Sequence, residues 1–400
     1  MKLVLLKKAD LPLEVVILLI GSMTMMITGI LLFPVSEGSL PYYENGLYGL
    51  LLVIFALQII TLGKTPFGEM GRSGVLLVAG VMIAAAGMVT CFIPIFKQLP
   101  RILLFLCFGP GGFLLLIQMC FLRDKLRTWV KYGGIFWHLI SGCSAVYVLS
   151  ILIALFLWKQ NPNTIPMAAV VILIYGLAIF YLACVIHKIY RKYPEAEKPA
   201  GKDIEFSTDQ AMLLLIGVFM LLLGLLLIPV NLGFLPFSKN AQLGLLMVIF
   251  AVQMLAAGST PIGVFPRSWP VIIGGILFAA IGIVSCIIPE ILVAQLTVLV
   301  GVLNILGGII TLVKICLSRK TPSEVPPAPA SSVVAKLFTV NLTMNLLQIL
   351  FGTSMLMPNL VPGLIIGVIL AANGCVLLYL LHILIVLDII KRNITAGTCN

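Results

Sequence analysis

Several amide side chains stand inside the apolar segments of this chain. Gln58 and Gln253 occupy equivalent places 195 residues apart. Five further candidates are confined to the second half: Asn304, Asn341, Asn345, Gln348 and Asn373. Asn341, Asn345 and Gln348 follow the spacing i, i+4 and i+7, so they share one helix face. Intramembrane polar residues are costly and usually point inward, so this face predicts a polar pathway or small-molecule pocket, or else interhelical hydrogen bonds, which we favour.

Residues that catalyse reactions or hold metals are scarce. The histidines His138, His187 and His382 do not place two imidazoles at membrane depth, as a bis-histidine haem requires. The nine cysteines form no C-x-x-C motif, and eight of them lie inside or at the ends of apolar segments, where cysteine acts as a small hydrophobic residue. The sequence therefore predicts no enzyme, no cofactor and no metal site.

Acidic residues are absent from the interior of the predicted spans and come no nearer than their ends. The three that come closest are Glu14, Glu290 and Asp388. A proton-driven pump or symporter is expected to hold a carboxylate at membrane depth. The pattern argues against proton coupling but not against a passive channel.

The composition is that of a membrane protein. Hydrophobic residues make up 61% of the chain and charged residues 10%, whereas a soluble domain carries about 25% charged residues. A helix needs about 20 apolar residues to cross the bilayer. By this criterion we predict an all-α polytopic protein with spans at 13–33, 46–63, 73–93, 101–121, 137–158, 166–187, 211–229, 241–258, 270–288, 293–316, 334–357 and 361–387.

Lysine and arginine predict the orientation of these spans. With a cytoplasmic N-terminus, four of the 25 basic residues fall outside, namely Lys97, Arg101, Lys159 and Lys239. The sequence thus predicts a multi-pass protein of the cell (inner or plasma) membrane with both termini in the cytoplasm. The net charge of +11 follows from this bias and indicates contact with anionic lipid head groups rather than nucleic acid. A homo-oligomer and a partner in a membrane complex both stay open.

The two halves of the chain repeat each other. ALQIITLGKTPFG (56–68) and AVQMLAAGSTPIG (251–263) share six of thirteen positions, and Cys91 recurs as Cys286. We therefore predict two parallel six-helix repeats, 1–187 and 211–400, joined by a cytoplasmic linker at 188–210. The shared Gly-x-Thr-Pro-x-Gly is typical of a turn that ends a helix.

Each half divides further into three helical hairpins. The odd-numbered helices all end at a proline on the outer side, from Pro34 to Pro358. This pattern, clearest in SWPVIIGGILFAAIGIVSCIIPEILVAQLTVLVGVLNILGGI (268–309), resembles the HdeD-type membrane proteins linked to bacterial acid resistance. The resemblance implies a six-helix unit, here duplicated in tandem, and a role in envelope stress or acid tolerance. It brings no catalytic residues.

Twelve spans in two parallel halves are also typical of major-facilitator transporters. Their signature between helices 2 and 3 has Asp four residues after Gly, where this chain has Phe67 and Ile262. We therefore expect a non-enzymatic membrane protein of envelope or acid-stress tolerance, or of membrane organisation. Two alternatives remain open: a small-solute transporter or channel that is not proton-coupled, and a membrane-anchor subunit of a larger complex.

Overall fold

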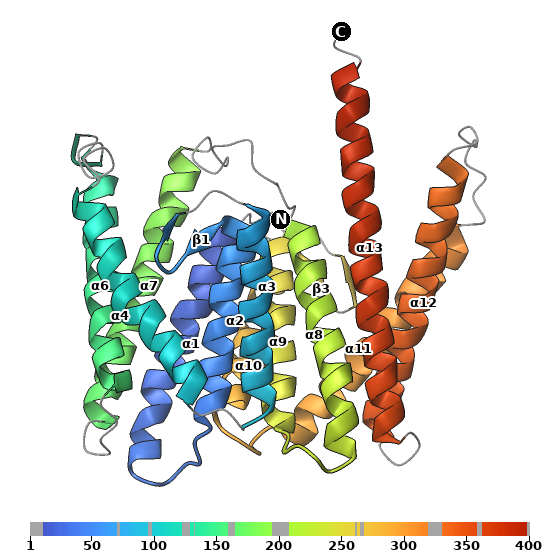
Figure 1. Cartoon of the computed structure of the whole chain (residues 1–400), viewed down its shortest axis with the longest axis horizontal. Coiled ribbons are helices and arrows are strands. Elements are labelled where there is room, and N and C mark those ends of the chain that lie inside the picture. The colour runs from blue at the N-terminus through green and yellow to red at the C-terminus, as the bar shows by residue number, and fades with distance from the viewer. Residues whose placement is uncertain are drawn as a thin grey trace, which may run out of the picture. The chain divides into compact units, whose positions relative to one another are not determined.

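A computed structural model describes residues 11–69, 73–94, 98–121, 129–131, 133–158, 165–193, 208–260, 262–264, 268–318, 330–357 and 362–397. Its helices are α1 (Leu13–Ser36), α2 (Glu44–Leu62), α3 (Gly74–Phe92), α4 (Gln98–Phe121), α6 (Ile135–Trp158), α7 (Ile165–Lys192), α8 (Thr208–Asn231), α9 (Lys239–Ala257), α10 (Trp269–Ile287), α11 (Val293–Ser318), α12 (Ala330–Leu356) and α13 (Gly363–Gly397). The strands are β1 (Lys64–Thr65), β2 (Gly68–Glu69), β3 (Ser259–Thr260) and β4 (Gly263–Val264). Figure 1 shows the order of these elements.

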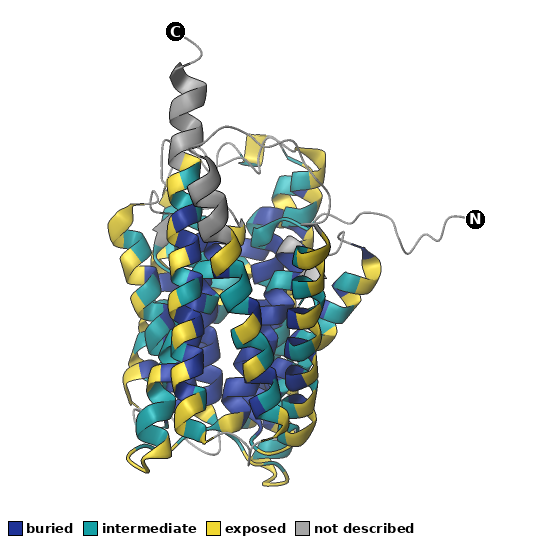
Figure 2. Ribbon diagram, turned by 90° about the vertical axis from the view of Figure 1, so that its right-hand side faces the viewer, coloured by how far each residue is buried: buried dark blue, intermediate teal, exposed yellow. Residues whose placement is uncertain are grey.

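The predicted all-α polytopic membrane fold is confirmed, and each predicted span coincides with one helix. Within the described residues, eleven helices are long and apolar enough to cross a membrane. The predicted span at 334–357 corresponds to α12, which is not one of the eleven and carries Asn341, Asn345 and Gln348. Large apolar side chains such as Val75, Met82 and Leu155 are exposed on the helix surfaces, and Figure 2 shows how exposed and buried faces alternate around the helices. Exposed apolar faces of this kind suit contact with lipid.

Helix contacts divide the chain into two compact units. One contains Met1–Glu205, Phe237–Ser259 and Phe265–Val293, and the other contains Phe206–Pro236, Thr260–Val264 and Ala294–Asn400. Helices α9 and α10 thus pack with the helices of the first half. This grouping describes packing, and the repeat boundaries drawn from the sequence stay a prediction. Of the predicted linker, 194–207 lies outside the described residues, 188–192 belongs to the end of α7, Tyr193 follows that helix, and 208–210 belongs to the start of α8.

The centre of the first unit is a bundle of two hairpins. Helix α2 packs on α3, α9 packs on α10, and the hairpins meet through α2 with α10 and α3 with α9 (Figure 1). Buried residues make up 83% of the apolar window of α2 and 89% of that of α9. These two helices therefore form the core on which the others pack.

Glycines bring helix pairs close at equivalent places in both halves. A Cβ at Gly29 would lie 2.8 Å from Leu173 N in the first unit, and a Cβ at Gly224 would lie 2.3 Å from Ala371 N in the second. The pairs are α1 with α7 and α8 with α13, which are the first and last helices of the two predicted repeats. Small residues let helix backbones approach in a membrane, so the same packing device occurs twice.

Two local predictions need correction. Pro34 and Pro229 do not end their helices: α1 continues to Ser36 and α8 to Asn231. A proline in the last turn loses only its own amide bond, and the Glu37 amide still donates to Phe33 O at 3.2 Å. The Gly-x-Thr-Pro-x-Gly turns also contain short antiparallel strands that the apolar pattern did not predict.

Candidate functional site

The first unit contains a partly open cavity of about 470 Å³. Its walls come from α1, α2, α4, α6 and α7, with β1 at one end. Most of the lining is apolar, as at Ile17, Phe55, Phe108 and Ile179. This volume lies within the range of about 300–1,000 Å³ that is usual for small-molecule sites.

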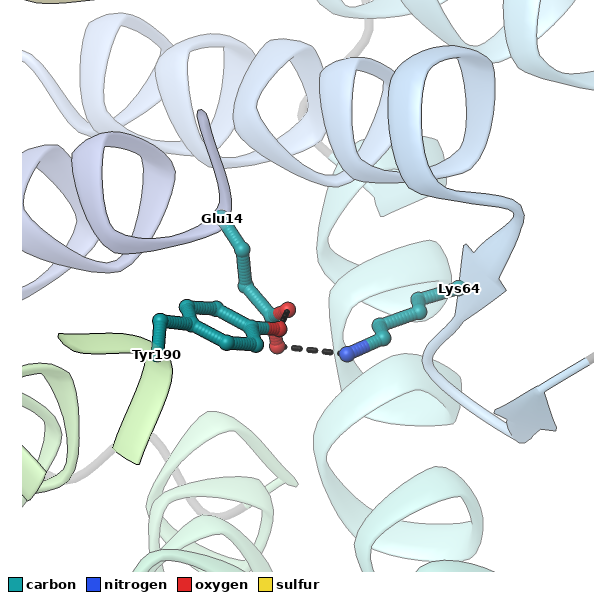
Figure 3. A network of polar contacts seen from close by, with 3 residues as sticks. All are labelled: Glu14, Lys64 and Tyr190. Carbon is teal, nitrogen blue, oxygen red and sulfur yellow. Dashed lines mark hydrogen bonds and ion pairs between the residues drawn. The ribbon is translucent and has the colours of Figure 1, made fainter. Parts of the chain in front are cut away.

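One end of the cavity carries a polar cluster of three residues. Lys64 Nζ lies 2.5 Å from Glu14 Oε1, and the Tyr190 hydroxyl donates to Glu14 Oε2 at 2.5 Å. Figure 3 shows the carboxylate between its two partners. The side chain of Glu14 is 14% exposed and that of Lys64 is 38% exposed. The cluster therefore forms a partly enclosed polar end to an apolar cavity.

Three separate elements deliver these side chains to one point. Glu14 stands in the first turn of α1, where the positive end of the helix dipole favours a carboxylate. Tyr190 belongs to the last turns of α7, and Lys64 is the first residue of β1. The cluster therefore ties the start of α1 and the end of α7 to the α2–α3 turn.

The α2–α3 turn has a conformation that aims Lys64 at the cavity. Gly63 caps α2 in the left-handed conformation, with φ 65°, and its amide donates to Ile59 O at 3.1 Å. Gly258 caps α9 in the same way, with φ 70°. The predicted helix-ending turn is thus present in both halves. In the first half, the Gln118 side chain of α4 also donates to Phe67 O at 3.0 Å, which supports the turn from the side.

Aromatic and small residues shape the interior of the cavity. Phe108 packs edge-on against Phe55 and Tyr175, with ring centroids 5.4 and 5.9 Å apart. A Cβ on Gly112 of α4 would clash with Ser150 Oγ of α6, so these helices approach closely at this depth. Because Tyr175 and Tyr190 both line the cavity and are fifteen residues apart on α7, the cavity extends about 22 Å along that helix.

The second half places asparagine where the first half has cavity-lining residues. A Cβ on Gly308 would lie 3.0 Å from Asn345 O, as a Cβ on Gly112 would lie 3.2 Å from Tyr147 O, which belongs to a cavity-lining residue. Gly374 likewise faces Leu221 as Gly176 faces Met26. These matching contacts indicate which residues of the two halves are equivalent.

In the same alignment, Asn304 is the equivalent of Phe108, and Asn373 is the equivalent of Tyr175. Ile216 is the equivalent of Gly21, and Gly21 lines the cavity. The equivalent positions of the second half therefore carry asparagine in place of two aromatic residues and a large side chain in place of Gly21.

The predicted polar residues occupy different surroundings. Gln58 is half-buried and lines the cavity. Asn304, Asn345 and Asn373 are buried, whereas Gln253, Asn341 and Gln348 are half-buried.

The hydrogen bonds of the buried asparagines stay within their own helices. Asn304 donates to Val300 O at 2.8 Å, and Asn345 donates to Asn341 O at 2.6 Å. The buried oxygen Asn373 Oδ1 has no hydrogen-bond partner. Whether these residues line a pathway stays a prediction.

Sequence reasoning missed Glu14, Lys64 and Tyr190 as parts of a site. Glu14 was identified only as an acid at a span end. One signal was available in the sequence. The repeated turn has Lys64 in its first copy and Ser259 at the equivalent position of its second copy. A charged residue present in only one of two equivalent turns indicates that the turns differ in role.

Metal-binding groups do not gather in the part of the chain that the structure describes. It holds no group of three or more His, Cys, Asp or Glu residues that could bind a metal. His138 Nδ1 lies 2.7 Å from the Tyr181 hydroxyl, and His187 Nδ1 is buried without a partner. No protein-family model matches the chain, and no match was found among curated proteins or solved structures.

Proposed function

We propose that this integral membrane protein is non-enzymatic and binds a single-chain amphiphile in the cavity of its first six helices. The observation that carries the proposal is an elongated apolar cavity that ends at the Glu14–Lys64–Tyr190 cluster. The apolar walls suit a hydrocarbon tail, and the cluster suits a polar head group.

The dimensions of the cavity favour one tail rather than two. A volume of about 470 Å³ spread over about 22 Å of helix gives a mean cross-section of about 20 Å². This area is close to the cross-section of one extended alkyl chain. A two-chain lipid does not fit without displacing wall residues such as Phe108, which is buried.

The charge of the cluster favours a head group that is uncharged or zwitterionic. Glu14 and Lys64 neutralise each other. A head group with a single charge would compete for one partner and leave the other unpaired in a partly enclosed site, which is unfavourable. A zwitterion offers a cation to Glu14 and an anion to Lys64 together.

The wider role follows from the resemblance to HdeD-type proteins, which implies envelope or acid-stress tolerance. Binding of a membrane amphiphile is compatible with that role and with the alternative of a small-solute transporter. The carboxylate of Glu14 stands at the start of α1 rather than at mid-depth. This position supports a function that does not depend on proton coupling.

Native mass spectrometry of the full-length protein, freed of lipid in detergent, tests the proposal. We expect one molecule of lysophosphatidylcholine to bind more tightly than lysophosphatidylglycerol or an alkyltrimethylammonium salt of equal chain length. Gly21→Ile introduces the side chain found at the equivalent position of the second half, where Ile216 stands. It extends into the cavity, so we expect at least a roughly tenfold loss of affinity, or about 1.4 kcal/mol.

Gly74→Ile is the matched control, because a Cβ at Gly74 meets nothing within 4 Å. This variant should bind like the unmodified protein. Equal affinities for Gly21→Ile and Gly74→Ile, or tighter binding of the anionic lysolipid, would overturn the proposal.

A further inference from the structure

Two cysteines at equivalent positions of the two halves meet in the central bundle of the first unit. Cys91 stands near the end of α3, and Cys286 near the end of α10. They are 0% and 1% exposed. The helices that carry them belong to different hairpins, so a bond between these residues would join the two hairpins.

The two thiols converge on shared partners. Cys91 Sγ donates to Gly46 O at 3.7 Å and to Ala241 O at 3.9 Å, and Cys286 Sγ donates to Ala241 O at 3.6 Å. Gly46 and Ala241 are themselves equivalent, 195 residues apart. Both sulfurs therefore lie within 4 Å of the same carbonyl oxygen, Ala241 O, in a locally symmetric setting.

Backbone hydrogen bonds hold the surrounding chain in register across the two hairpins. The amide of Tyr43 donates to Ile287 O at 2.9 Å, and the amide of Ser238 donates to Phe92 O at 2.9 Å. The acceptors are the residues that directly follow the two cysteines. A Cβ on Gly46 would also clash with the carbonyl oxygen of Cys286, so α2 and α10 are in close contact there. This frame keeps both sulfurs in reach of each other.

We propose that Cys91 and Cys286 form a disulfide that covalently links α3 to α10. Two S–H bonds break and one S–S bond forms. A disulfide oxidant, of the kind that acts by thiol–disulfide exchange, accepts the two electrons and two protons and is released as two thiols. The exchange takes place during assembly, while the helix ends are still accessible, because the folded protein buries both sulfurs.

Charge and compartment both favour a disulfide over a metal site. Two thiolates around a monovalent soft cation would leave a net negative charge in an apolar interior, whereas a disulfide is neutral. The orientation predicted from lysine and arginine puts the ends of α3 and α10 on the outer side. Disulfides persist in such oxidising compartments.

Mass spectrometry of the full-length protein in its native membranes tests the link directly. Membranes are dissolved in a denaturing detergent with an alkylating reagent, with and without prior reduction, and then digested. We expect a cross-linked peptide pair containing Cys91 and Cys286 that separates on reduction. Cys143→Ala, which changes another buried cysteine, should keep the cross-link.

A thermal assay gives a second readout. Reduction should lower the melting temperature of the unmodified protein but not that of Cys91→Ala or Cys286→Ala. Complete alkylation of both cysteines without reduction, also after treatment of the membranes with diamide, would overturn the proposal.

Discussion

Adding one methyl group at either of two equivalent glycines should weaken the central bundle to the same extent. Gly49 faces α3, and Gly244 faces α10. A Cβ at Gly49 would lie 2.5 Å from Gly87 O and 2.6 Å from Cys91 N. A Cβ at Gly244 would lie 2.5 Å from Gly282 O and 2.7 Å from Cys286 N. All four neighbours are backbone atoms, which cannot turn aside as a flexible side chain can.

The size of the effect follows from two opposing terms. Overpacking of this kind costs about 1–3 kcal/mol. Replacing glycine by alanine inside a helix stabilises it by about 1 kcal/mol. Gly21→Ala isolates the second term, because the nearest atom to a Cβ there is Ile54 Cγ2 at 4.0 Å. Gly49→Ala and Gly244→Ala should therefore each be about 1–3 kcal/mol less stable than Gly21→Ala.

Equilibrium unfolding in mixed micelles, followed by circular dichroism during titration with sodium dodecyl sulfate, measures these differences. The two bundle variants should agree with each other within about 0.5 kcal/mol, because their contacts match. If Gly244→Ala is as stable as Gly21→Ala, the backbones of α9 and α10 do not approach as described. If only one bundle variant is destabilised, the two hairpins are not packed alike.

Two further predictions concern charged residues. Glu14→Gln should shift the ligand preference toward lysophosphatidylglycerol, because the Lys64 ammonium loses its carboxylate. It should also lower the free energy of unfolding, by about 1–3 kcal/mol, because the cluster is partly enclosed. An unchanged preference in the native mass spectrometry assay would contradict the assigned head-group site. Arg101 donates to Leu157 O at 2.6 Å and to Trp158 O at 3.1 Å. Lysine lacks the forked geometry of arginine, so Arg101→Lys should speed amide hydrogen exchange in the last turn of α6. Unchanged exchange there would show that these bonds do not hold the helix end.

The sequence was sufficient for the elements that depend on local pattern. Each apolar segment of spanning length became a helix, and the repeated turns contain the left-handed glycines, Gly63 and Gly258, that the motif predicts. Gln58, identified as polar and intramembrane, lines the cavity. These features follow from hydropathy and backbone conformation, which neighbouring residues determine.

The candidate site could not be predicted in the same way. Glu14 and Tyr190 are 176 residues apart, and Glu14 and Lys64 are 50 apart. Charged and aromatic residues at span ends are ordinary interfacial residues until packing brings them together. The cavity is lined by Gly21 and by side chains from five helices, and its existence depends on how those helices pack. Hydropathy patterns carry no information on either.

The two halves differ at the cavity and agree at the helix contacts. Glycine pairs bring α1 to α7 and α8 to α13 in the same manner, and the α2–α3 and α9–α10 hairpins share their close approaches. At cavity positions, however, the second half has Ile216 for Gly21 and Ser259 for Lys64. Ile216 would fill space, and Ser259 removes the cation that pairs with a carboxylate in the first half. The repeat predicted from the sequence thus agrees with the helix contacts that the two halves share, whereas the proposed amphiphile site requires the residues of the first half alone.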